Sequence, residues 1–102
     1  MKPVDINSLK EFQKEGPRRQ ILFDSEKMRV VLFCLEAGQE IPAHTTTSEL
    51  LMLALEGKGS FLVGGDVHPV KGGSAVACKS QEPHGMKAEE RLVVLAVIAP
   101  RP

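Results

Sequence analysis

Two histidines stand where the sequence changes from polar to apolar, and they are the residues best suited to chemistry. His44 follows a polar, small-residue stretch and precedes the apolar run 50–55, and His84 directly follows Pro83. A neutral imidazole can bind a transition metal or hydrogen-bond a small ligand. We therefore take His44 and His84 as the candidate site.

Several neighbouring side chains have two readings each. The Thr46 hydroxyl could contact a ligand, although the segment 45–48 could equally be a turn that caps its own backbone. Met52 and Met86 could line a cavity or simply fill the core. The third histidine, His68, stands between two apolar residues, and we expect it to be structural or on the surface.

Other catalytic patterns are missing from the sequence. We find no Ser-His-Asp or Cys-His arrangement, no phosphate-binding loop and no paired carboxylates. The sequence therefore points to no nucleophile with a recognisable base.

Composition narrows the class of protein further. The 102 residues suit one domain, and 13 basic residues balance 13 acidic ones. Without a basic stripe, Trp or Tyr, we expect no nucleic-acid partner. No apolar run is long enough for a membrane helix and no signal peptide begins the chain, so we expect no membrane partner and a cytoplasmic location. Cys34 and Cys78 lie in apolar runs, where buried reduced thiols are expected and a disulfide remains open.

Short apolar segments separated by turn signals predict an all-β protein. We expect one domain, 1–102, with an N-terminal arm, 1–17, and an antiparallel sandwich or barrel, 18–99. A helical turn over 7–12 would be capped by Asn7 or Ser8, and 85–90 looks loose. The predicted strands are 18–23, 28–35, 50–55, 60–63, 67–70, 74–78 and 91–99.

Three of these segments, 28–35, 50–55 and 92–99, are apolar on both faces. A barrel interior needs only one face, so the other must be covered by the flank of the second sheet or by another subunit. We expect a homodimer through outward-facing Leu51, Leu53 and positions like Val31.

The spacing of glycines and histidines resembles the cupins, a β-barrel superfamily. Its first motif reads Gly-x5-His-x-His-x3,4-Glu-x6-Gly, and Gly38, His44 and Gly57 match it. Its second motif reads Gly-x5-Pro-x-Gly-x2-His-x3-Asn, which Gly73 and His84 match. The resemblance covers roughly residues 28–99 and implies an antiparallel double-sheet barrel of the jelly-roll type, with the two histidines meeting inside it.

Two of the four ligand positions of the metal-binding cupins differ here. Thr46 stands where the second histidine is expected, and Leu50 stands where the glutamate is expected. Only two imidazoles remain, so the resemblance implies either no metal or a weakly held divalent transition metal at His44 and His84. Three positions of the second motif also differ: Lys79, Gln81 and Ala88 replace proline, glycine and asparagine.

Two hypotheses about function follow. The first is a barrel that binds a small, largely apolar molecule or an anion in its cavity. The second is a metal-dependent enzyme of the dioxygenase, isomerase or decarboxylase type, with His44 and His84 as metal ligands. The expected ligand-binding residues are His44, Thr46, Leu50, Met52, His84 and Met86.

Overall fold

Nine strands and one short helix make up the computed structural model, which describes all residues, 1–102. The elements are α1 (Ile6–Leu9), β1 (Arg18–Asp24), β2 (Arg29–Leu35), β3 (Glu40–His44), β4 (Glu49–Glu56), β5 (Lys58–Val63), β6 (Asp66–Lys71), β7 (Ala75–Cys78), β8 (His84–Ala88) and β9 (Leu92–Ala99). No helix is long and apolar enough to cross a membrane.

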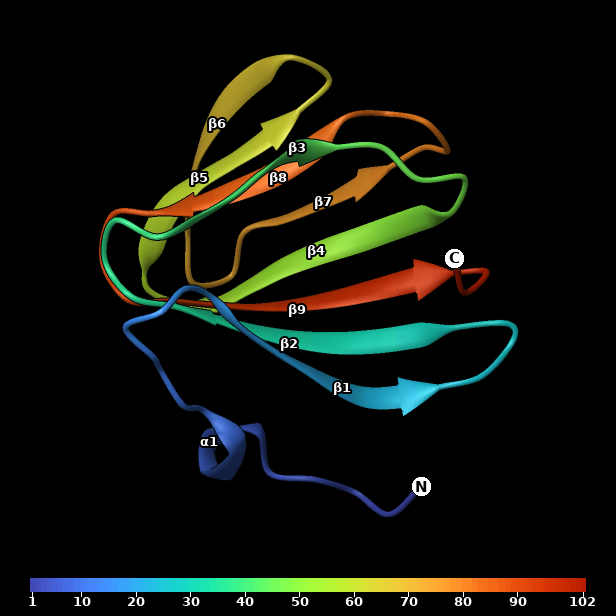
Figure 1. Cartoon of the computed structure of the whole chain (residues 1–102), viewed down its shortest axis with the longest axis horizontal. Helices are drawn as coiled ribbons and strands as arrows, with labels where there is room; N and C mark the ends of the chain where they lie inside the picture. Colours follow the sequence, from blue (N-terminus) through green and yellow to red (C-terminus); the bar gives the residue numbers. More distant parts are fainter.

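The strands form two antiparallel sheets that lie one above the other (Figure 1). One sheet has the order β1-β2-β9-β4-β7, and the other has the order β3-β8-β5-β6. This arrangement confirms the predicted antiparallel double-sheet barrel. β1–β2 and β5–β6 are consecutive in the sequence, but other neighbouring strands are far apart in it, as β2, β9 and β4 show.

The core fills the space between the sheets. Met52 and Leu92 reach it from the five-stranded sheet, and Phe61 and Met86 reach it from the four-stranded sheet. Along β4, Leu50, Met52 and Ala54 are buried while the alternate residues are more exposed. Burying each large apolar side chain stabilises the fold by about 1.5–3 kcal/mol.

The outer face of the five-stranded sheet is covered in part by the chain's own N-terminal arm. Ile6, Leu9 and Phe12 pack against a cluster that includes Leu32 and Val93. The apolar outer faces of β2 and β9 therefore need no second subunit at this place, which differs from our expectation.

Two details of the arm and its sheet correct the sequence predictions. Asp5 caps α1 by accepting a hydrogen bond from the Asn7 backbone at 3.0 Å, whereas Asn7 or Ser8 had been expected as the cap. Val31 is fully buried and pairs with Ala96, so its predicted outward orientation is wrong.

Two strands appear where the sequence shows no strand pattern. The segment of β3 was expected to be a polar, small-residue stretch, and the segment 85–90 was expected to be loose, but β3 and β8 pair with each other. Both are short, and β3 contains Pro42. These two segments form strands because of the strands beside them, and a local sequence pattern carries no information about such neighbours.

The two cysteines behave as expected. Cys34 and Cys78 are free and buried. Burial raises the pKa of both thiols, so they stay protonated at neutral pH and are poor nucleophiles.

Two positions of the motifs have a backbone conformation that favours glycine. Gly57 has a φ of 94°, and a Cβ there would lie 1.8 Å from the Arg91 carbonyl oxygen, so only glycine fits. Gln81 stands where the second motif has glycine, yet it also adopts a positive φ, 66°. A non-glycine residue in this region is strained by roughly 1–2 kcal/mol.

Replacing Gln81 with glycine should therefore stabilise the protein. We expect the free energy of unfolding of Gln81→Gly to rise by about 1 kcal/mol, measured by urea denaturation. Gln81→Ala is the matched control, because it keeps the Cβ and hence the strain. Equal stabilities of the two variants would show that the backbone at this position is not strained.

Candidate functional site

The two candidate histidines are opposite each other on paired strands. His44 ends β3, His84 begins β8, and the antiparallel register makes them partners. Their ring centroids are 4.4 Å apart, and the ring planes are tilted by 60°. The imidazoles that we expected to meet, although they are distant in the sequence, are therefore in contact.

Gly85 allows the strands to approach closely beside the two rings. A Cβ at this position would lie 2.6 Å from the Ile41 carbonyl oxygen and 2.9 Å from the Ala43 nitrogen. Only glycine therefore permits this pairing. The sequence analysis passed over Gly85, although a glycine next to a strand histidine is a signal of close backbone approach.

Backbone carbonyls fix the orientation of both rings. His44 Nδ1 lies 3.0 Å from the Pro42 carbonyl oxygen, and His84 Nδ1 lies 3.0 Å from the Glu82 carbonyl oxygen. A carbonyl oxygen can only accept a hydrogen bond, so each Nδ1 must carry the hydrogen. In the neutral ring, Nε2 then keeps its lone pair.

The environments of the two rings differ. His84 is buried, with 6% of its surface exposed, whereas His44 is exposed at the edge of the site. Burial lowers the pKa of His84 below the usual 6.5, the His44 ring lowers it further, and the hydrogen bond to Glu82 partly opposes the shift. His84 is therefore neutral at neutral pH.

A small cavity of about 50 Å³ adjoins the two rings. Leu50 and Met52 of β4 and Met86 of β8 contribute to its wall, as do His44 and His84. The structure thus brings five of the six expected ligand-binding residues to one cavity. Its remaining lining residues are Phe33, Ile41, Gly85, Ala96 and Ile98. The four apolar residues of this set point to the inward side of their strands. Alternation along the strands could have indicated them, but the sequence analysis did not apply it to these residues.

Thr46, the sixth expected residue, does not line the cavity. Its hydroxyl accepts a hydrogen bond from the Ser48 backbone at 3.3 Å, and its carbonyl oxygen accepts one from the Gln81 backbone at 2.7 Å. The segment 45–48 is therefore a turn that caps its own backbone, the second of its two expected readings.

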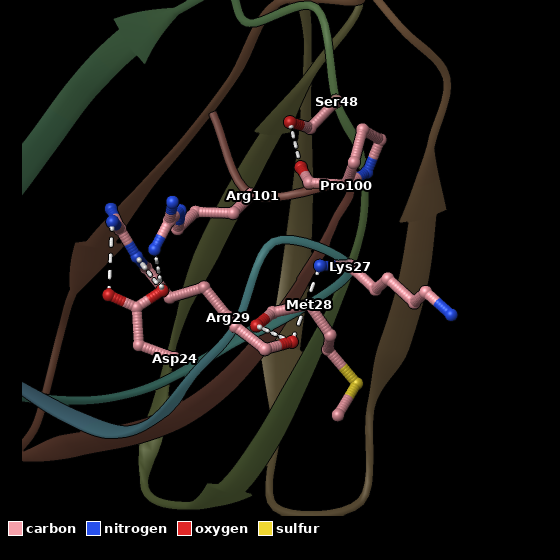
Figure 2. Close-up of polar contacts among 8 residues, drawn as sticks. Asp24, Lys27, Met28, Arg29, Ser48, Pro100 and Arg101 are labelled. Atoms are coloured by element: carbon pink, nitrogen blue, oxygen red, sulfur yellow. Dashed lines mark hydrogen bonds and ion pairs between the residues drawn. The ribbon is translucent and has the colours of Figure 1, made fainter.

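The C-terminal tail anchors the segment that follows His44 (Figure 2). The fully buried Ser48 hydroxyl donates to the Pro100 carbonyl oxygen at 2.5 Å. Arg101 lies 3.7 Å from the Asp24 carboxylate, which also pairs with Arg29. The tail therefore joins the start of β4 to the turn between β1 and β2.

No third histidine joins the two at the site. His68 is exposed on β6, opposite Phe61 and in agreement with the expected surface position. The structure contains no group of three or more His, Cys, Asp or Glu residues that could hold a metal ion.

Comparison with known proteins agrees with this architecture. The family model described as Cupin domain matches residues 31–98. The crystal structure of TT1209 from Thermus thermophilus is 30% identical, with 100% of each chain covered and a TM-score of 0.94. An RmlC-like cupin protein from Desulfovibrio desulfuricans is 32% identical, with 98% of this chain and 97% of that chain covered and a TM-score of 0.90.

A more distant match shows the fold alone. A salicylate 1,2-dioxygenase variant from Pseudoaminobacter salicylatoxidans is 16% identical, with a TM-score of 0.78 over 84% of this chain and 27% of that one. No curated protein matches the chain. The family match spans two thirds of the sequence and agrees with the two stacked sheets, so this chain belongs to the cupin family.

Proposed function

We propose that this cupin is a binding protein that holds one small ligand at the Nε2 atoms of His44 and His84. The observation that carries the proposal is the tie between each Nδ1 and a backbone carbonyl oxygen at 3.0 Å. It leaves a lone pair on each Nε2 of the neutral rings, and a lone pair accepts a hydrogen bond or coordinates a metal. A lone pair on Nε2 also repels anions. The anionic ligand that the sequence analysis considered would therefore bind only if the rings were protonated.

The size of the cavity limits the ligand. Pockets for drug-sized molecules occupy roughly 300–1,000 Å³, whereas this cavity has about 50 Å³. One water needs about 10–15 Å³, so the space suits a metal ion or the end of a larger molecule. The rest of such a molecule could occupy an adjoining groove of about 350 Å³, which shares Phe33, Ile41 and His44 with the cavity and adds Arg19 and Glu40.

The wall of the cavity favours binding over catalysis. Apart from the two imidazoles, no lining side chain carries an ionisable or hydroxyl group. General acid–base chemistry would therefore depend on the histidines alone. This is the basis for preferring a binding protein to the dioxygenase, isomerase or decarboxylase alternative.

The four-ligand metal set of the metal-binding cupins does not fit these residues. Thr46 replaces one histidine and uses its hydroxyl within the turn, and Leu50 replaces the carboxylate with a buried apolar side chain. Iron or manganese sites of that kind need oxygen donors and an anionic ligand to offset the charge of the ion. We therefore derive no reaction through such an ion.

Nitrogen-15 NMR of the histidine rings tests the proposal. In the neutral rings of His44 and His84 we expect both Nε2 atoms to be unprotonated, and excess Zn²⁺, used as a diamagnetic probe, to shift both signals. Formate should shift neither, because it is an anion. His68 is the internal control, and its signals should respond no more than those of a free exposed imidazole.

The proposal fails if Nε2 carries the hydrogen in either neutral ring, or if Zn²⁺ leaves both rings unchanged. His44→Ala should abolish the Zn²⁺ response of His84, since one imidazole alone holds the ion weakly.

The low pKa of His84 predicts a pH-dependent stability. The unfolded imidazole takes up a proton near pH 6.5, but folded His84 does so only at lower pH. The unfolded state therefore binds more protons in this window, and His84 makes the protein less stable as the pH falls below about 6.5. The free energy of unfolding of the wild type, relative to His84→Gln, should fall across this window and level off below the folded pKa.

Urea denaturation at a series of pH values measures this difference, and the carboxylates cancel because both proteins contain them. His68→Gln is the control for removal of an imidazole outside the site. A curve for His84→Gln that runs parallel to the wild type would mean that His84 titrates normally.

We also propose that the chain forms a homodimer in a reducing, cytoplasmic setting that suits its two free thiols. Leu51 is 41% exposed, and it borders an outer groove of about 450 Å³. Glu49 and Lys79 flank this apolar groove, so a two-fold axis could bring each near its opposite charge. Leu53 is half-buried beside it, and Val31 takes no part because it faces the interior.

Sedimentation velocity tests the dimer. The wild type should sediment as a dimer at micromolar concentration, and Leu51→Lys should sediment as a monomer because it buries a charge in the apolar contact. Val67→Lys, at an exposed apolar position on β6, is the control and should remain dimeric. A monomeric wild type would exclude the proposed association.

A further inference from the structure

We infer that the cavity is a site for monovalent copper, held by the two imidazoles together with the thioether sulfur of Met52 or Met86. The inference rests on the proposed function, since it names the ligand of the same cavity. It arises from the disagreement between these residues and the four-ligand set of the metal-binding cupins.

The four donors surround one space from both sheets. His44 and His84 come from the four-stranded sheet, and Met52 comes from β4 in the opposite sheet. Met86 follows His84 by two residues on β8, so both side chains lie on the same face. The two methionines are almost fully buried, with exposures of 1% and 3%. Met52 therefore reaches the cavity from the sheet opposite the imidazoles, and Met86 reaches it from the strand that carries His84.

The separation of the rings requires a third donor. Two imidazoles on opposite sides of one ion would place their centroids roughly 6 Å apart, given metal–nitrogen bonds of about 2.0 Å. The observed centroid distance is 4.4 Å. His44 and His84 would therefore occupy neighbouring coordination positions and leave the other side of the ion to sulfur.

The chemistry of the wall selects the ion. Imidazole nitrogen and thioether sulfur are soft donors that suit monovalent copper, whereas magnesium, calcium and manganese prefer oxygen donors. No carboxylate, hydroxyl or amide side chain lines the cavity. Because every donor is neutral and Leu50 adds no charge, a monovalent ion is also less costly to bury here than a divalent one.

Anaerobic competition with a coloured Cu(I) chelator, such as bicinchoninate, tests the inference. We expect the wild type to withdraw one Cu(I) per chain, and Met52→Leu/Met86→Leu to bind it at least about tenfold more weakly, as loss of one metal–ligand bond implies. The response of the His44 and His84 signals to Zn²⁺ should be unchanged in this double variant. Leucine conserves the volume of methionine, so the fold is maintained, and thermal unfolding followed by circular dichroism checks this.

Matched controls come from the same chain. Met28→Leu removes a thioether outside the cavity, His68→Ala removes an exposed imidazole, and Cys34→Ala/Cys78→Ala removes two buried thiols, a group that in general can also bind Cu(I). All three should bind Cu(I) as the wild type does.

The outcomes distinguish failure of the copper inference from failure of the histidine site. If the methionine double variant binds Cu(I) as tightly as the wild type, while His44→Ala/His84→Ala does not bind it, the copper inference is overturned and the histidine site stands. If the histidine double variant also retains wild-type affinity, neither survives.

Discussion

The pairing of β3 with β8 is the constraint on which the candidate site depends. The register sets His44 opposite His84, and Gly85 lets the two backbones approach beside the rings. A shift of one residue in either strand would move its histidine to the other face of the sheet. The carbonyls of Pro42 and Glu82 then hold the rings in one tautomer, so the same short stretch of backbone determines both the position and the protonation pattern of the site.

Much of the fold could be predicted from the sequence, because its strongest strands carry their own signal. The runs that became β2, β4 and β9 are dense in branched apolar residues, and they form the centre of the larger sheet. β3 and β8 were missed because their strand conformation depends on the partners beside them, not on their composition.

The role of the N-terminal arm was missed for a related reason. Ile6, Leu9 and Phe12 form no long periodic pattern, and their role is visible only from their packing against Leu32 and Val93.

The candidate site divides in the same way. The contact of His44 with His84 followed from the motif resemblance, whereas the sequence left open whether Met52 and Met86 line a cavity or only fill the core. The turn that occupies the Thr46 hydroxyl depends on contacts with Ser48 and with the backbone of a distant loop. Spacing alone does not encode such contacts. The tautomer of each histidine cannot be predicted from the sequence either, because it depends on the orientation of the Pro42 and Glu82 carbonyl groups.

Leu50 has a consequence for the stability of the barrel. A carboxylate at this buried position would be an unpaired charge whenever no ion was bound. An unpaired charge in the protein interior is unfavourable. Leu50 is uncharged and packs within the core cluster, so the fold does not need a bound ion to neutralise this position. If the site binds a ligand as proposed, the stability of the fold would not depend on that ligand, so the ligand could dissociate without unfolding the protein.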